Sequence, residues 1–205
     1  MLVTEIKKAK KGLVTVTVDG KAFELNAETV AAAGIDKNSA LSECEFLALC
    51  KQSDCDRAKS RALWYLSRAD HSRRALYDKL CRIYGDEAAS AATERMEELG
   101  LIDDYALASR LASGWSAANV SNKEILRKLF AKGIPSEIAK QAVEELSPDS
   151  QAQIKQLLET KYRTRLKNED GVRKVYAALI RKGFSYSDVR TALKEYSEIL
   201  ENCEE

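Results

Sequence analysis

The sequence predicts a mainly α-helical protein that begins with a small β-hairpin or sheet and continues as tandem three-helix repeats forming an elongated curved array. Three observations predict this fold class. Alternating valines followed by Asp19-Gly20 indicate a β-hairpin near the start of the chain. From about residue 56 onward the apolar pattern is almost wholly helical. Within that part Gly85, Gly133 and Gly183, each placed to end a helix, recur at intervals of 48 and 50 residues.

Length and composition describe an ordinary globular chain. Its 205 residues give room for one or two domains, and 45% of them are hydrophobic while 32% are charged. No apolar run approaches the roughly 20 residues that a membrane-spanning helix needs. The basic N-terminus lacks the apolar core of an export signal, so we expect a cytoplasmic protein without membrane contact.

The first 55 residues predict strands and short helices. Val14, Val16 and Val18 alternate with threonines, Asp19-Gly20 supplies a tight turn, and residues 2–9 can add a third strand. The lysines of this segment either protect the edge of the sheet or contact a polyanion. A short helix is expected from Asn26 to Gly34. A capping box of Ser42 and Glu45 then opens a longer helix.

Three later segments share one pattern, in which an apolar pair precedes a helix-ending glycine and a second amphipathic helix follows it. The pairs are Leu76 with Leu80, Ile125 with Leu129, and Val175 with Leu179. We therefore predict four parts: a strand-rich segment (1–55) and three-helix repeats at 56–105, 106–147 and 148–205. Basic and acidic stretches alternate along these repeats, so the chain has strongly charged segments although its net charge is only +1.

Asp103 and Asp104 are the residues that most resemble a catalytic or metal-binding pair. Gly100 can end the preceding helix, Asp103 suits the N-cap of the next, and Asp104 adds favourable charge to its first turn. A helix start therefore explains both acids without chemistry. Phosphate-binding glycine motifs and a nucleophile elbow are absent. We expect no enzyme activity and no cofactor.

The cysteines raise the alternative of a zinc site. Cys44, Cys50 and Cys55 with His71 have spacings that fit zinc poorly, and no C-x-x-C occurs. An odd count of five, which includes Cys81 and Cys203, favours free thiols in a reducing compartment. We expect no metal.

Three stretches in this order resemble the RecX family, regulators of the bacterial RecA recombinase. They are LSRADHSRRALYDKL (66–80), ELGLIDDYALASRL (98–111) and KEILRKLFAKGIPSEIAKQAVEEL (123–146). The resemblance extends over the whole chain, more loosely at residues 150–197. Ala75 and Leu107 stand where the family often has Glu and Phe, and both changes concern helix capping and packing.

The resemblance implies a regulator that modulates, mainly by inhibition, the RecA filament on single-stranded DNA. It would lie along the filament groove as a monomer and limit filament growth, strand exchange and co-protease activity. A helical regulator that acts on DNA directly, in the manner of helix-turn-helix proteins, stays open as the alternative.

The candidate contact surface consists of cations on the second helix of each repeat. Stacked repeats could align them in one stripe, although solvated helix faces would carry many such residues too. The helix-cap candidates beside them are Ser72, Asp103 and Asp104. The contact candidates are Arg73, Arg74, Lys79, Arg82, Lys123, Arg127, Lys128, Lys132, Arg173, Lys174, Arg181 and Lys182.

Overall fold

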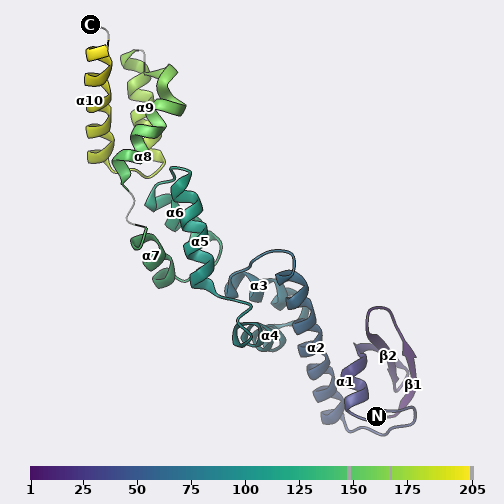
Figure 1. Cartoon of the computed structure of the whole chain (residues 1–205). Helices are drawn as coiled ribbons and strands as arrows, with labels where there is room; N and C mark the ends of the chain where they lie inside the picture. The colour runs from purple at the N-terminus through teal and green to yellow at the C-terminus, as the bar shows by residue number, and fades with distance from the viewer. Residues whose placement is uncertain (147–148, 167, 204–205) are drawn as a thin grey trace. The chain divides into compact units, whose positions relative to one another are not determined.

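The computed structural model describes the main chain of residues 1–146, 149–166 and 168–203, with side chains as far as residue 197. Pro148 and the side chain of Cys203 lie outside this part. The chain folds into two compact units, Met1–Asp103 and Asp104–Glu205. The described residues contain three strands and ten α-helices (Figure 1). The mainly α class with a small N-terminal sheet is therefore confirmed, while the elongated curved array stays a prediction.

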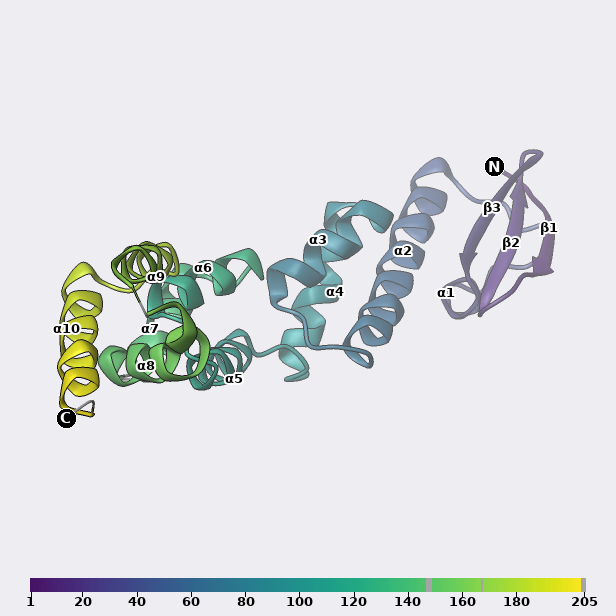
Figure 2. The same cartoon turned by 90° about the horizontal axis from the view of Figure 1, so that it is seen from above.

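The sheet is antiparallel with strand order β1-β2-β3 (Figure 2). Val14, Val16 and Val18 are buried on one face, whereas the threonines between them are only half-buried. Asp19 and Gly20 both have positive φ, 47° and 80°, as a two-residue hairpin turn requires. The hairpin and the third strand are thus confirmed. The strands are β1 (Val3–Lys8), β2 (Leu13–Val18) and β3 (Lys21–Asn26).

Helices α1 (Ala27–Ala32) and α2 (Glu43–Leu66) cover the buried face of this sheet. Ser42 and Glu45 form both hydrogen bonds of the expected capping box at the start of α2. The helix then continues without a break for 24 residues. The expected segment boundary at residue 55 therefore falls inside a helix, and the division into four parts stays a prediction.

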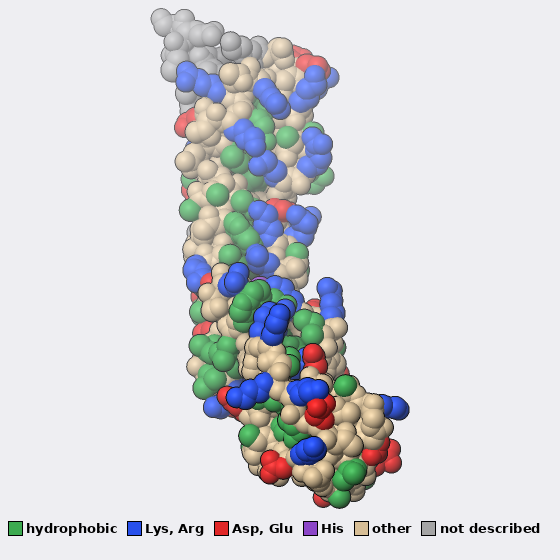
Figure 3. Space-filling model, turned by 90° about the vertical axis from the view of Figure 1, so that its right-hand side faces the viewer, with side chains coloured by type: hydrophobic (Ala, Val, Ile, Leu, Met, Phe, Trp, Pro, Cys, Tyr) green, Lys and Arg blue, Asp and Glu red, His purple; other side chains and the backbone are tan. Residues whose placement is uncertain are grey.

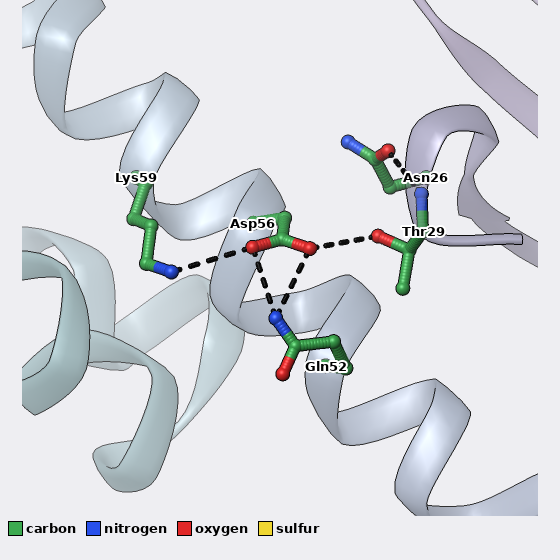
Figure 4. Close-up of polar contacts among 5 residues, drawn as sticks. All are labelled: Asn26, Thr29, Gln52, Asp56 and Lys59. Atoms are coloured by element: carbon green, nitrogen blue, oxygen red, sulfur yellow. Dashed lines mark hydrogen bonds and ion pairs between the residues drawn. The ribbon is translucent and has the colours of Figure 1, made fainter. Parts of the chain in front are cut away.

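Asp56 connects α1 to α2 through hydrogen bonds (Figure 4). Its carboxylate accepts from the Thr29 hydroxyl at 2.8 Å, from the Gln52 amide at 3.1 Å and from the Lys59 ammonium at 3.4 Å. Burial by itself would raise the pKa of Asp56. These hydrogen bonds outweigh that effect and hold the pKa below its ordinary value.

The first three-helix module is built on the second half of α2, with α3 (Arg73–Tyr84) and α4 (Asp86–Glu98). The apolar pair Leu76 and Leu80 is fully buried in its core. Gly85 alone separates α3 from α4, and its φ of 82° lets the chain reverse within one residue.

The second and third modules each have their own core and form the C-terminal unit. The apolar pairs of these modules are buried as well, with exposures of 0% to 1%, so all three pairs are confirmed as core. The second module contains α5 (Asp104–Ala117), α6 (Asn122–Ala131) and α7 (Ser136–Glu144). The third contains α8 (Ser150–Leu157), a π-helical turn (Leu158–Tyr162), a 3-10 turn (Arg163–Arg165), α9 (Glu169–Arg181) and α10 (Tyr186–Cys203).

Candidate interaction surface

Helix α6 buries an apolar pair on one side and carries basic residues on the other. Ile125 and Leu129, one turn apart, are fully buried in the core of the second module. Arg127 is exposed and Lys128 is half-buried. The helical period therefore directs these cations away from the core.

The end of α9 lies close to the start of α6 because a glycine stands there. Gly183 has a φ of 91°, a conformation that glycine adopts readily just after a helix. Its N–H donates to the Ile180 carbonyl, and the Phe184 N–H donates to the Leu179 carbonyl. A Cβ at Gly183 would lie 2.8 Å from the Ser121 hydroxyl oxygen. Both the backbone conformation and the close approach thus require glycine.

Ser121 makes the contact between these two helices. Its side chain is the N-cap of α6 and accepts the Glu124 N–H at 3.3 Å. The same hydroxyl donates a short hydrogen bond to the main-chain carbonyl of Lys182, the C-cap residue of α9. One buried side chain therefore serves a free N–H of one module and a free carbonyl of the next.

A cavity of 440 Å³ lies at this contact, and most of its charged side chains are cations. Among the described residues that line it, Glu124 is the one acid, and Arg127 binds both oxygens of that carboxylate at 2.8 and 2.6 Å. These hydrogen bonds hold the pKa of Glu124 below its ordinary value. The lining residues are Asn119, Val120, Ser121, Glu124, Arg127, Lys128, Arg181 and Lys182.

Positive charge in this cavity exceeds what its own carboxylate neutralises. Burial lowers the pKa of Lys182, and the positive charges of Lys161 and Lys128 lower it further. Such crowding of cations around a partly enclosed space favours an anionic ligand. Figure 3 shows lysine and arginine side chains gathered on one face of the C-terminal unit.

Four of the cations predicted from the sequence thus meet around one cavity, namely Arg127, Lys128, Arg181 and Lys182. The remaining candidates of the C-terminal unit have other surroundings. Lys123 is next to Gly183, with its Cβ 3.1 Å from the position of an added Cβ, and Lys132 is the C-cap residue of α6. Arg173 lines a separate hollow at the start of α9, and Lys174 pairs with Asp170 at 3.1 Å.

The four candidates on α3 belong to the N-terminal unit. A stripe that joins them to α6 and α9 stays a prediction. Three of them contact neighbours in their own module. Arg73 pairs with Glu97 at 3.0 Å, Arg74 pairs with Asp78 at 3.1 Å, and Lys79 Nζ lies 3.3 Å from His71 Nε2. Arg82, the fourth, is exposed in the last turn of α3.

The three cap candidates lie at helix starts. Ser72 is the N-cap residue of α3 and accepts the Ala75 N–H at 3.1 Å. Asp104 is the first residue of α5, and Asp103 directly precedes it. The position of the two acids agrees with a role in starting that helix, and the capping role of Asp103 stays a prediction.

Two parts of this surface were missed from the sequence. Ser121 and Glu124 have the S-x-x-E spacing of a helix start, so the cap itself could have been found. The hydrogen bond from Ser121 to Lys182 spans 61 residues and has no local signal. Gly183 could be expected to end a helix, but its closeness to Ser121 depends on how the two modules pack.

Another cavity, of 620 Å³, lies between α1 and α2 and is mostly apolar. Its polar end contains Asp56, whose hydrogen bonds are made inside the chain. In the described ranges no cluster of three His, Cys, Asp or Glu residues is suited to a metal ion, and Cys44, Cys50, Cys55 and Cys81 are free thiols. No helix among the residues that the structure describes is long and apolar enough to cross a bilayer.

Two family models match the helical part of the chain. Residues 58–96 match the first three-helix domain of RecX, and residues 149–193 match the third. Among curated proteins, the Regulatory protein RecX of Clostridioides difficile is 27% identical over 95% of this chain and 95% of its own length. The Regulatory protein RecX of Prosthecochloris aestuarii is 32% identical over 70% of this chain and 95% of its own length.

Solved structures show the same fold. A crystal structure of regulatory protein RecX, 25% identical, superposes with a TM-score of 0.69 over 95% of this chain and 98% of that chain. The crystal structure of RecX from Lactobacillus salivarius, 26% identical, gives 0.62 over 69% of this chain and 96% of that one. The likeness includes the N-terminal part, since the first of these structures covers nearly the whole chain.

Proposed function

The chain belongs to the RecX family, and on this premise we propose that it regulates RecA by binding along the RecA–DNA filament. There it limits filament growth, strand exchange and co-protease activity without catalysing a reaction of its own. The relatives are named regulatory proteins, and no sequence motif here points to catalysis. The resemblance of the sequence to regulators of RecA supplies the partner.

The observation that carries this proposal is the basic cavity between α6 and α9. It is lined by Arg127, Lys128, Arg181 and Lys182, which come from two modules, and by the carboxylate of Glu124. A filament of protein on DNA offers phosphates and acidic side chains in one repeating surface. Cations from two modules that meet at one place can bind such a surface at several points.

Charge reversal in this cavity is the direct test. The double variant Lys128→Glu with Lys182→Glu should bind RecA filaments at least ~10-fold more weakly, because like charges would now face each other across the contact. Binding is measured by co-sedimentation with filaments on single-stranded DNA at two salt concentrations. Inhibition is measured as RecA-driven ATP hydrolysis with and without the protein. Helix content by circular dichroism verifies that the variant is folded.

A matched control changes the same amount of charge elsewhere in the C-terminal unit. Lys140→Glu with Arg190→Glu alters two exposed cations that do not line the cavity. This variant should keep filament binding and inhibition within about twofold of the unchanged protein, because exposed charges away from a contact contribute little. Equal losses in both double variants would mean that net charge, and not this cavity, determines binding.

The same variants separate filament regulation from direct action on DNA. For naked duplex DNA, the logarithm of affinity should fall with the logarithm of salt by about 0.9 for each phosphate neutralised. If the protein regulates DNA directly, the cavity variant loses duplex binding as strongly as filament binding. If it regulates the filament, the loss appears mainly when RecA is present.

A further inference from the structure

An exposed aromatic and basic cluster lies at the end of α2. Trp64 remains 41% exposed near the last turn of that helix. The guanidinium of Arg68 lies 4.2 Å from the centroid of its ring system, and that of Arg61 lies 4.7 Å away. We call Arg61, Trp64, Tyr65, Arg68 and Lys79 the Trp64 cluster.

Tyr65 anchors the cluster to the first module. Its ring packs partly against the module core and meets Trp64 edge to face, with centroids 5.2 Å apart. Lys79 Nζ, on α3, lies 5.0 Å from the Tyr65 centroid, and Arg61 lies 5.4 Å from it. Residues from α2, from the position just after it and from α3 therefore meet in the cluster.

Among the described residues, Arg61 and Arg68 next to Trp64 have no carboxylate partner. Across the ranges that the structure describes, neither Arg61 nor Arg68 forms an ion pair with a carboxylate. Other arginines of this unit do: Arg57 pairs with Asp54 and Arg95 with Glu98. The positive charge around Trp64 is thus available to a ligand, and so is the exposed part of the ring system.

The chemistry of the cluster selects among ligands. A cationic ligand would be repelled by Arg61, Arg68 and Lys79. An acidic peptide would use these charges but leave the indole without a role. Unpaired nucleotides match both features, because bases stack on aromatic rings and guanidinium planes while phosphates accept from Lys and Arg. Duplex DNA offers no such match, since its bases are already stacked on one another.

We propose that the Trp64 cluster binds single-stranded nucleic acid, with an unpaired base stacked on Trp64 and the adjoining guanidinium planes of Arg61 and Arg68. Lys79 then contacts a neighbouring phosphate. The site belongs to the N-terminal unit, whereas the cavity between α6 and α9 belongs to the C-terminal one. It does not rest on the function proposed above, which requires no contact between this protein and bases.

Intrinsic fluorescence makes this site directly observable. The chain has two tryptophans, so a Trp115→Phe background leaves Trp64 as the single tryptophan, whose emission is excited apart from that of the tyrosines at the long-wavelength edge of its absorption. Titration with a labelled oligothymidine of twelve nucleotides, without RecA, should quench the Trp64 emission. The quenching should saturate at the same concentration as the fluorescence anisotropy of the labelled oligonucleotide. A duplex of the same length should quench it far less. An absence of quenching by the single strand would overturn the proposal.

Substitutions in the same background distinguish stacking from charge. Trp64→Ala should weaken oligothymidine binding roughly tenfold or more, within the range that one stacked base contributes, and Trp64→Phe should restore much of the loss. Leu63→Ala, at a neighbouring apolar residue that is also exposed, should leave the affinity unchanged. The pair Arg61→Lys with Arg68→Lys keeps the charge but removes the planar groups, so it should also weaken binding.

Each of the opposite results has a definite meaning. Unchanged affinity in Trp64→Ala, with helix content intact, would show that the indole does not bind bases. Unchanged affinity in the double lysine variant would show that Arg61 and Arg68 contribute charge only, and would overturn the proposal that the base also stacks on their guanidinium planes. Displacement of the oligothymidine by polyglutamate at equal charge would assign the cluster to an acidic protein surface instead. All of these assays omit RecA, so their failure leaves the filament proposal to be judged separately.

Discussion

The hydroxyl of Ser121 donates a hydrogen bond to the main-chain carbonyl of Lys182 and accepts one from the Glu124 N–H. This places the start of α6 against the end of α9. The cations Lys128 and Lys182 belong to different modules, and this hydrogen bond helps to keep them at the same cavity. A residue without charge is therefore central to the geometry of a basic surface.

Ser121→Ala removes both hydrogen bonds at once. The lost cap and the carbonyl left without its donor should together lower the free energy of unfolding of the C-terminal unit by about 2 kcal/mol. Ser185→Ala is the matched control in the same unit. Among the described residues, the Ser185 hydroxyl accepts the Asp188 N–H and otherwise contacts only the Ser187 hydroxyl, so its hydrogen bonds stay within one module. It should cost about 1 kcal/mol.

Urea unfolding followed by Trp115 emission, in a Trp64→Phe background, measures both serine variants in the C-terminal unit. Equal losses in the two variants would show that the bond to Lys182 contributes no stability. A larger loss in Ser121→Ala should be accompanied by weaker filament binding, since the cavity would lose the contact that positions its two helices.

The fold was largely predictable because its signals are local. Apolar residues at helical spacing identified the buried pairs, such as Ile125 with Leu129, and Asp19-Gly20 identified the hairpin. These features depend on a few neighbouring residues, whose side-chain directions follow from the helix and strand periods. The continuous α2 was less predictable, because its polar positions near Ser53 resemble a break until the contact between Ser53 and Asn26 is seen.

The candidate surface was only partly predictable. Arg127, Lys128, Arg181 and Lys182 could be picked out as cations of second helices, but periodicity does not say which of twelve candidates meet. Which of them meet depends on the close contact between Gly183 and Ser121, a tertiary contact that no sequence pattern predicts. Trp64 was missed for a related reason: an aromatic residue at a helical position is usually core, and only the packed module shows that this one is exposed.

Two glycines in helices should respond oppositely to alanine. A Cβ at Gly171, in the first turn of α9, would lie 1.7 Å from the Arg165 carbonyl oxygen, so the backbone must shift. Gly171→Ala should therefore destabilise the C-terminal unit by about 2 kcal/mol or more. Apart from its chain neighbours and the backbone of its own helix, Gly114 in α5 has no described atom within 4 Å of such a Cβ. Gly114→Ala should stabilise by about 0.5–1 kcal/mol. Thermal unfolding of both variants measures this. Stabilisation by Gly171→Ala would contradict the close packing at Gly171, and destabilisation by Gly114→Ala would contradict the open space at Gly114.

Asp56 should make the N-terminal unit sensitive to acid. Its pKa is held below the ordinary value in the folded protein by hydrogen bonds from Thr29, Gln52 and Lys59. The resulting stability is present above the unfolded pKa of about 4 and is lost as the pH falls through the lower folded pKa. Asp56→Asn should lower the free energy of unfolding by about 1 kcal/mol at pH 7. It should also make stability fall less steeply as the pH is lowered. Urea unfolding from pH 7 to pH 3 is the measurement, and an equally steep fall in the variant would refute the role of Asp56.

Lys182 is expected to reduce stability while it supports binding. Burial, followed by the charges of Lys161 and Lys128, lowers its pKa in the folded protein. At a pH between the folded and unfolded pKa values, the unfolded chain binds more protons at Lys182 than the folded protein, so stability rises with pH there. Below both pKa values, Lys182 lowers the free energy of unfolding by its full amount. Lys182→Gln should therefore stabilise the protein at pH 7. The gain should be at most ~0.5 kcal/mol, because solvent screens a partly exposed ammonium.

The same substitution should weaken the response to an anion. Pyrophosphate should raise the thermal midpoint of the unchanged protein, because a ligand that binds only the folded state stabilises it, and the rise should be clearly smaller in Lys182→Gln. Lys140→Gln, an exposed lysine 3.7 Å from Glu137, is the control and should change neither the midpoint at pH 7 nor the pyrophosphate response. A Lys182→Gln protein that is less stable yet keeps the full response would show that Lys182 serves packing, and would remove it from the anion-binding surface.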